Sequence, residues 1–346
     1  MNLRGCQAEP AYLAKYGMTS VHKFLIMYGG FNYVIPRECK ELWAYNTING
    51  IWRRYKAPVT APNACLFPSL CAVGSIIYIF GGTELFDATL MTNSLISFNV
   101  CTTTWEILSP HTEICDLNTP PPVYGSCIFY HKEYLYVLGG MQRIGDLDAM
   151  YKFCLKTFTW SLVSQNGRKP LLTFRIFGTV FNNHGSSQIN RFVNVNIFDF
   201  FTNSWTTRPT SSKTQQYPDD RNDESFTFSN NLGYLCGGKN PHTFTSYNDI
   251  WRIDLETLEW IKLDYTVQTT EFIQCTSVVN GSYLYSFEGE GNGYDRKYML
   301  QRFTVQPPTL YRLCLESITR SPSLRNCSNY LPAAIVDELD LNNNDS

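Results

Sequence analysis

The stretch IIYIFGG (76–82) is a short β-type run that ends in two glycines, and it recurs along the chain. Related stretches are FLIMYGG (24–30), YLYVLGG (134–140) and GYLCGG (233–238). A second element follows in phase: a strand-like segment, a polar turn and then a tryptophan, as in LISFNVCTTTW (95–105). These tryptophans are separated by 53, 55, 45 and 55 residues: Trp52, Trp105, Trp160, Trp205 and Trp260. The chain is therefore built from a repeat of about fifty residues.

Each repeat holds enough residues for about four short strands separated by turns. One such unit cannot cover both faces of its own sheet, so the faces must be buried against neighbouring units. Paired glycines allow positive φ and close approach of the backbone, and a tryptophan supplies a large wedge between adjacent sheets. The pattern resembles the kelch repeat over residues 14–306. We therefore predict an all-β, six-bladed kelch β-propeller, followed by a short C-terminal helical segment.

Two blades depart from the pattern. The sixth, YLYSFEGEGNG (283–293) followed by KYMLQRFTV (297–305), has no fourth strand before the helical segment, so we hypothesise that residues before Lys15 supply that strand. The fourth lacks a glycine pair near NNHGSSQIN (182–190), and either it is degenerate or a strand is missing from the sequence. The predicted organisation is therefore a ring-closing segment (1–13), the propeller (14–306), a helical box (307–341) and a polar tail (342–346).

The chain has 346 residues, of which 44% are hydrophobic and 17% charged, and its formal net charge is −2. This balance does not indicate a surface for nucleic acid or for an anionic membrane, and it favours protein or peptide partners. No apolar run is long enough for a signal peptide or a membrane span. We therefore expect a cytoplasmic location, with the nucleus as a second compartment. The twelve cysteines form no CxxC pair and are interpreted as free core thiols.

Signatures of catalysis are absent from the sequence. It contains no HExxH, GxSxG, P-loop or GxGxxG motif, and GEGNG (289–293) lacks the spacing and the helix that a phosphate cradle needs. The five histidines are isolated and show no metal-ligand spacing. We therefore expect no catalytic residue, no metal and no cofactor.

A helical period begins after Pro307. Thr309 is suited to cap a helix, and one apolar face follows it: Leu310, Leu313, Cys314, Ser317 and Ile318. A second short helix is predicted in LPAAIVDEL (331–339), where Pro332 suits the first turn. Its residues Ile335, Val336 and Leu339 also share a face. Both helices could pack on the propeller rim or on each other, or their faces could receive a partner.

The order T-L-x-x-x-C-x-x-x-I from Thr309 to Ile318 matches the BC box by which SOCS-box and VHL-box proteins bind elongin C. The segment LPAAIVDEL resembles the cullin-selecting box of the same families. With ELWAYNTINGIW (41–52) and PTLYRLCLESITRSP (308–322), these features make the chain resemble kelch-repeat substrate receptors of cullin-RING ubiquitin ligases. The resemblance implies elongin B/C and cullin-2, or cullin-5, as partners. It implies these adaptor-binding residues: Leu310, Leu313, Cys314, Ile318, Pro332, Ile335, Val336 and Leu339.

The same resemblance implies that the propeller binds C-terminal degrons, which are peptide tails ending in small residues such as glycine or alanine. A free carboxylate in a pocket needs a bidentate arginine or a set of hydroxyl and amide donors. We expect these donors where the innermost strand of a blade begins, because such positions face the mouth of the channel. The candidates are Arg175 in blade four, Arg221 and Ser225 in blade five, and Gln274 in blade six.

Three functions remain open from the sequence. The first is a ligase substrate receptor without catalysis of its own. The second is a kelch scaffold that binds a cytoskeletal or signalling protein without a ligase role, and the third is an enzyme.

Overall fold

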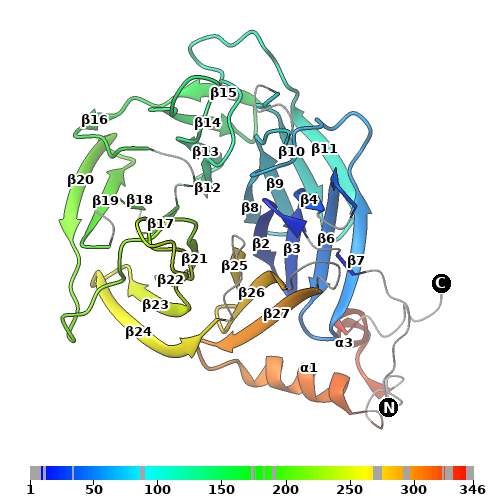
Figure 1. Cartoon of the computed structure of the whole chain (residues 1–346). Coiled ribbons are helices and arrows are strands. Elements are labelled where there is room, and N and C mark those ends of the chain that lie inside the picture. Colours follow the sequence, from blue (N-terminus) through cyan, green and yellow to red (C-terminus); the bar gives the residue numbers. More distant parts are fainter. Residues whose placement is uncertain are drawn as a thin grey trace.

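Six of the seven sheets in the described part of the chain are arranged around a central axis like the blades of a propeller (Figure 1). The computed structural model of the chain describes residues 9–10, 13–32, 35–85, 90–172, 175, 177–181, 184–188, 192–267, 275–290, 297–321, 323 and 330–339. Within each blade the strands follow one another in chain order from the axis to the rim. The predicted all-β propeller followed by a short helical segment is confirmed.

Blade one contains β2 (Gly17–Val21), β3 (Phe24–Tyr28), β6 (Glu41–Asn46) and β7 (Ile51–Lys56). Blade two contains β8 (Ser69–Val73), β9 (Ile76–Phe80), β10 (Leu95–Asn99) and β11 (Thr104–Ser109). Blade three contains β12 (Cys127–His131), β13 (Tyr134–Leu138), β14 (Met150–Cys154) and β15 (Thr159–Leu162). Blade four contains β17 (Gly178–Phe181), β18 (His184–Gln188), β19 (Asn194–Asp199) and β20 (Ser204–Pro209). Blade five contains β21 (Ser225–Ser229), β22 (Leu232–Cys236), β23 (Asp249–Asp254) and β24 (Glu259–Thr266), and blade six contains β25 (Cys275–Val279), β26 (Tyr283–Glu290) and β27 (Lys297–Thr304).

The burial of each strand reflects its place in the blade. In β9 the four residues 77–80 are buried, because neighbouring sheets cover both faces of this second strand. In β11, at the rim, no residue is buried: Thr104 and Glu106 are exposed and the other four residues are half-buried. The hydrophobic core is therefore divided among the interfaces between blades.

The glycine pairs lie where the second strands end. Gly81 and Gly82 have φ of +69° and +126°. A Cβ atom on Gly81 would lie 2.5 Å from the carbonyl oxygen of Val123, in the segment that leads into blade three. This confirms that the pair allows both positive φ and a close approach between blades.

The recurring tryptophans lie between blades, as predicted. The ring centroid of Trp160 is 5.5 Å from that of Phe80 in blade two. The indole of Trp260 packs against Phe192 of blade four, and its Nε1 donates to the carbonyl oxygen of Phe192 at 2.8 Å. Each wedge therefore buries apolar surface of the preceding blade.

Over the described residues, side-chain hydrogen bonds join blades six and one. Tyr16 Oη donates to the carbonyl oxygen of Phe287 at 2.8 Å, and Ser20 Oγ donates to that of Val278 at 2.6 Å. The short strand β1 (Leu13–Ala14) pairs with β4 (Phe31–Asn32), which in turn pairs with β5 (Arg37–Glu38) in a separate small sheet. The hypothesis that residues before Lys15 add a fourth strand to blade six is therefore wrong for residues 13–14, and residues 1–8 and 11–12 lie outside the described part. Over the described residues blade six has three strands.

Blade four has its four strands, and β16 (Asn166–Gly167) runs parallel to β20 at its outer edge. No strand is missing from this part of the sequence, so that alternative is corrected. What the blade lacks is the glycine pair, and only residues 189–193 separate β18 from β19, whereas residues 81–94 separate β9 from β10.

The C-terminal helices lie against the outside of blade one. Helix α1 (Leu310–Arg320) is capped by Thr309, whose side chain accepts from the backbone nitrogen of Arg312 at 3.2 Å. Helix α3 (Ala333–Glu338) follows it. Leu315 of α1, Leu339 after α3 and Ile48 in the hairpin between β6 and β7 form one buried cluster. Figure 1 shows α1 below β27, at the edge of the ring.

Candidate functional site

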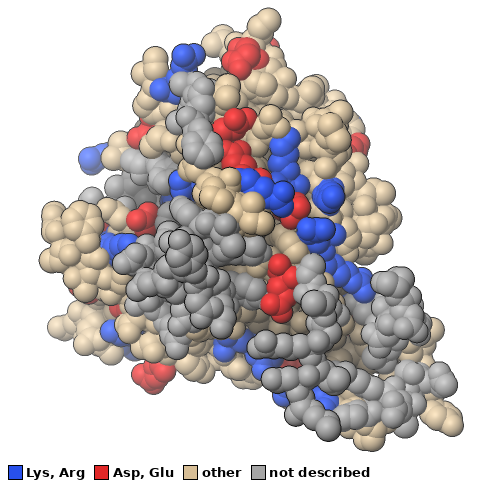
Figure 2. All heavy atoms as spheres, turned by 45° about the vertical axis from the view of Figure 1, so that its right-hand side comes forward, with Lys and Arg blue, Asp and Glu red and all other residues tan. Residues whose placement is uncertain are grey.

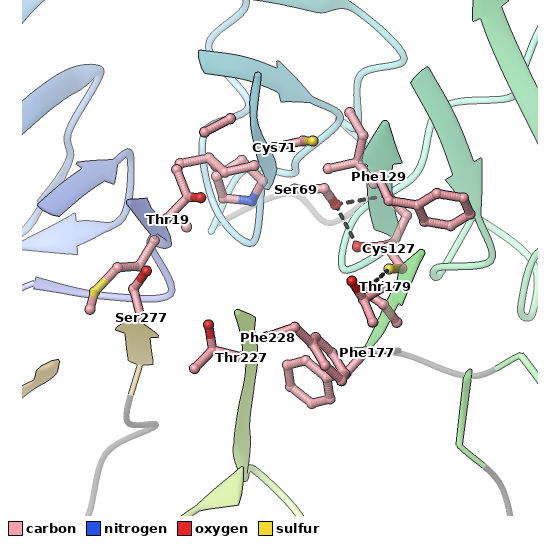
Figure 3. Close-up of a pocket in the computed structure, with 18 of the residues that line it drawn as sticks. Thr19, Ser69, Cys71, Cys127, Phe129, Phe177, Thr179, Thr227, Phe228 and Ser277 are labelled. Atoms are coloured by element: carbon pink, nitrogen blue, oxygen red, sulfur yellow. Dashed lines mark hydrogen bonds between the residues drawn. The ribbon is translucent and has the colours of Figure 1, made fainter. Parts of the chain in front are cut away.

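A cavity of about 660 Å³ lies on the propeller axis and is lined by the innermost strand of all six blades. Figure 3 shows hydroxyl side chains from five of these strands arranged around one open space: Thr19, Ser69, Thr179, Thr227 and Ser277. Blade three contributes Cys127 and, just before it, Ser126. The channel therefore offers many hydrogen-bonding groups to a ligand.

Hydrogen bonds between neighbouring inner strands fix the channel wall. Ser69 Oγ donates to the carbonyl oxygen of Ser126 at 2.6 Å and lies 2.8 Å from its hydroxyl. Cys127 Sγ donates to the carbonyl oxygen of Gly178 at 3.7 Å. Blades two, three and four are thus tied together at the wall of the cavity.

A collar of residues with positive φ surrounds the mouth of the channel, just before the inner strands begin. Its members in blades one to four are Lys15 (φ +61°), Phe67 (+52°), Gly125 (+64°) and Arg175 (+57°). Backbone hydrogen bonds link them in series, from Phe67 N to Lys15 O (2.7 Å), from Gly125 N to Phe67 O (3.0 Å) and from Arg175 N to Gly125 O (2.9 Å). Left-handed backbone costs free energy in residues other than glycine, so this chain of bonds is what holds the collar.

The propeller with its repeated glycine pairs and tryptophans agrees with the comparison to known families. The model of the KLHDC2/KLHL20/DRC7 Kelch-repeats domain matches residues 3–185, more than half of the chain. The chain belongs to the kelch-repeat family. Kelch domain-containing protein 10 of Rattus norvegicus is 25% identical over 309 residues, covering 84% of this chain and 72% of the relative.

Two human relatives extend the comparison. Kelch domain-containing protein 10 of Homo sapiens is also 25% identical, over 84% of this chain and 67% of its own length. Kelch domain-containing protein 3 of Homo sapiens is 24% identical over 76% of this chain and 57% of its own length. Kelch-repeat membership supports a protein-interaction role for the propeller.

Arg175 lines the kelch channel, where the sequence predicted a ligand donor. The side chain is half-buried, and its Cζ lies 5.7 Å from the ring centroid of Phe177. Its Nη1 is buried, and no acceptor for it is found among the described residues. A buried charged donor without a partner is costly, so this nitrogen is available to an acceptor on a ligand.

Ser225, the first residue of β21, is buried and also lines the cavity. The structure thus brings Ser225 and Arg175 to the same channel, and their role in peptide binding stays a prediction. Gln274, the third candidate, lies outside the described residues.

Arg221 does not line the channel, and its assignment to peptide binding is corrected. The side chain is fully buried, with Nη1 donating to Asp249 Oδ1 at 2.6 Å and to the carbonyl oxygen of Gly237 at 3.0 Å. Its Cζ lies 4.2 Å from the ring centroid of Tyr247. Burial alone would raise the pKa of Asp249, but the hydrogen bond and charge of Arg221 lower it overall. Arg221 therefore holds the loop before β21 onto β22 and β23.

Lys15 is a channel residue that the sequence reasoning missed. It lines the cavity from blade one, and its Nζ lies 5.7 Å from the ring centroid of Phe67. Lys15, Phe67 and Gly125 occupy the same collar position in blades one, two and three. Of these three residues, only Gly125 is of the type expected at positive φ. The sequence alone could not reveal this collar position, because its residues share no type or motif.

Helix α1 has one exposed and one buried face. Leu310 is 80% exposed, Leu313 is 42% exposed and Cys314 is also exposed, whereas Ile318 is half-buried. Three of the four predicted adaptor-binding residues of α1 are therefore exposed.

The opposite face of α1 is fixed by a buried charge network. Glu316 accepts from Arg312 Nε at 2.8 Å and from Arg320 Nη2 at 2.8 Å, and it lies 3.4 Å from Arg302 of β27. Arg312 Nη2 also donates to the carbonyl oxygen of Thr47 at 2.8 Å. Burial alone would raise the pKa of Glu316, but the arginine contacts lower it overall. The helix is thus held to both blade six and blade one.

The second predicted adaptor-binding face is largely turned inward. Val336 and Leu339 are buried, Ile335 is half-buried and packs on the cluster around Leu315, and Pro332 is exposed. In the isolated chain, α1 and the first blade cover the face formed by Ile335, Val336 and Leu339. The expectation that this face is free for a cullin is therefore corrected.

Other site chemistry was sought in the described ranges. They contain no group of three or more histidine, cysteine, aspartate or glutamate side chains placed to hold a metal ion. On the face in Figure 2, lysine and arginine side chains lie beside aspartate and glutamate, so no broad field of one sign is seen there. Among the described helices, none has the length and apolar character needed to cross a membrane.

Proposed function

We propose that this chain is the substrate-recognition subunit of a cullin-RING ubiquitin ligase. In this proposal the propeller channel binds the C-terminal tails of substrates, and α1 binds elongin B/C. A cullin, cullin-2 or cullin-5, joins through the part of the α3 segment that stays exposed, which includes Pro332. The chain itself performs no catalysis.

The observation that carries the proposal is the exposed apolar face of α1. Leu310, Leu313 and Cys314 follow the spacing of a helix face and remain exposed, although Leu315 one residue later is 2% exposed. A short helix with a few apolar anchors is a common way of filling a groove on a partner. Full burial of one leucine contributes about 1.5–3 kcal/mol, so burial of Leu310 and Leu313 would supply part of the binding free energy.

The buried face of α1 also supports the proposed role as a substrate-recognition subunit. Because Arg312, Glu316 and Thr319 are buried and bonded to the first blade or to one another, α1 has a fixed orientation on the propeller. A partner that binds α1 would therefore hold the channel at a fixed position. A ligase needs this geometry to present a bound substrate.

Arg175 supports the binding of a C-terminal tail in the channel. A terminal carboxylate supplies the acceptor that its buried Nη1 lacks within the described part of the chain. Ser225 and the channel hydroxyls provide further donors nearby. A small last residue fits this proposal because the carboxylate must reach a half-buried guanidinium.

The test is the binding of purified elongin B/C to the full chain and to a Leu310→Ser, Cys314→Gln double variant. We expect the variant to lose at least about tenfold in affinity, because two anchors of the face are removed. Thermal melting should stay unchanged, since neither side chain belongs to the core. Phe201→Ser is the matched control, because Phe201 is 95% exposed in a hairpin of blade four.

Unchanged elongin binding by the double variant would refute the assignment of α1. A large fall in melting temperature would show that the face is part of the core instead. Loss of binding in Phe201→Ser as well would indicate nonspecific apolar association.

A protein-interaction scaffold without a ligase role is the second candidate. The burial of Val336 and Leu339 favours it, because these residues have little surface left for a cullin. Failure of the unmodified chain to bind elongin B/C would select this function.

A further inference from the structure

The channel is positively charged although the whole chain carries a formal net charge of −2. Lys15 and Arg175 are the charged side chains among the described residues that line it, and these lining residues include no aspartate or glutamate. Neither cation forms an ion pair with a described residue. The charges of the cavity therefore remain to be balanced by a ligand.

The two cations are held in matching ways on opposite sides of the ring. Lys15 belongs to blade one and Arg175 to blade four, so two blades separate them in either direction. Each occupies a collar position at positive φ and lies 5.7 Å from an aromatic ring, Phe67 for Lys15 and Phe177 for Arg175. The backbone bonds of the collar fix both positions, so the mouth has two separate cationic points.

The surroundings of the two points differ. On blade five, next to Arg175, the equivalent collar residue is Asp223, which has φ of +59° and is exposed. Its carboxylate would repel a second acidic group placed on that side. A ligand that already uses Arg175 for one carboxylate therefore gains most by directing another toward blade one.

We propose that Lys15 forms a second anion subsite, so that the preferred ligands are acidic C-terminal tails. The terminal carboxylate binds at Arg175, as the proposed function requires, and an acidic side chain upstream in the tail binds at Lys15. An extended peptide spans about 3.3–3.6 Å per residue, so the spacing between the two acids is limited by the width of the mouth. Tails with glutamate or aspartate at that spacing are selected over neutral ones.

The experiment uses the full chain and fluorescein-labelled serine-rich peptides that end in glycine with a free carboxylate. One glutamate is moved stepwise upstream from the C-terminus, and each peptide is paired with its glutamine counterpart. We expect one or two positions at which glutamate binds about three- to tenfold tighter than glutamine, as measured by fluorescence polarisation. The difference should shrink as salt is raised.

Lys15→Gln should remove this preference, and Lys15→Arg should retain it. The matched control is Lys132→Gln, because Lys132 also has positive φ (+43°) but lies in the hairpin between β12 and β13, away from the collar. Equal affinity of the glutamate and glutamine peptides at every position would overturn the second subsite. So would an equal loss of preference in Lys15→Gln and Lys132→Gln.

The two proposals fail separately in this assay. If amidation of the peptide C-terminus leaves affinity unchanged, the terminal carboxylate is not recognised. The proposed binding of C-terminal tails in the channel is then excluded. If amidation weakens binding but glutamate and glutamine peptides remain equal, the proposed function stands and the acidic subsite is excluded.

Discussion

Replacing Arg221 with alanine is predicted to damage the fold of blade five rather than to remove a ligand contact. The guanidinium is fully buried, and its loss leaves the carboxylate of Asp249 and the carbonyl of Gly237 without their main donor. Breaking a buried ion pair from one side typically costs about 3–5 kcal/mol. The carboxylate of Asp249 keeps Trp251 Nε1 at 2.7 Å, so we expect the lower end of this range.

Thermal melting of the purified variants measures the effect. For a chain of 346 residues, a cost of about 3 kcal/mol corresponds to a fall in melting temperature of about 4 °C. An Arg221→Leu, Asp249→Leu double variant should recover part of the loss, because it removes both charges. Recovery should be incomplete, since Trp251 Nε1 then lacks its acceptor.

Arg175→Ala is the matched comparison, because this guanidinium forms no ion pair with a described residue and faces the channel. It should leave the melting temperature nearly unchanged and weaken peptide binding. The reasoning is refuted if Arg221→Ala melts like the unmodified chain yet fails to bind peptide. That result would return Arg221 to the ligand site.

Three further outcomes are expected. Gly81→Ala should destabilise the fold by about 2–4 kcal/mol, from left-handed strain and overpacking, whereas Gly74→Ala should cost only about 1 kcal/mol, because nothing lies within 4 Å of its added Cβ; equal melting of the two variants would contradict this. The pKa of Glu316 is lower in the folded chain than its ordinary value of 4.5. The ionised carboxylate therefore stabilises the fold above pH 4.5, and this contribution is lost as the pH falls through the lower folded pKa. The difference in melting temperature between the unmodified chain and Glu316→Gln should therefore shrink on acidification below about pH 4.5, and a constant difference would argue against an ionised contact. At mildly alkaline pH, iodoacetamide should label the exposed Cys314 but not Cys127, because burial raises the pKa of the Cys127 thiol to about 12. Mass spectrometry of the labelled chain measures this, and labelling of Cys127 but not of Cys314 would contradict it.

The elements of the blades were predictable because they depend on local pattern. A glycine pair at the end of a strand and a tryptophan after a polar turn have their effect wherever the repeat occurs, and both appear in blade two as Gly81–Gly82 and Trp105. The cap at Thr309 was equally local, because it needs only one hydroxyl and the first turn of a helix. The free thiols were predicted correctly for the described cysteines, but Cys101, Cys115 and Cys314 proved exposed rather than part of the core.

The roles of individual arginines could not be predicted in the same way. Arg175 and Arg221 both precede an inner strand, but one lies at the collar and the other beneath the loop. Asp249, which decides the role of Arg221, is 28 residues away in sequence. A count of residues before the strand cannot reveal such a partner, because the loop turns inward by an amount that the sequence does not specify.

The sequence alone determined the repeat, the blade strands and the helical segment, since each depends on residues close together in the chain. The tertiary structure decided which surfaces remain free. It placed Lys15 opposite Arg175 by closing the ring, and it covered Leu339 with α1 while leaving Leu310 exposed. The physical reason is that exposure and charge pairing depend on which distant segments meet, and these contacts arise only when all six blades have closed around the axis.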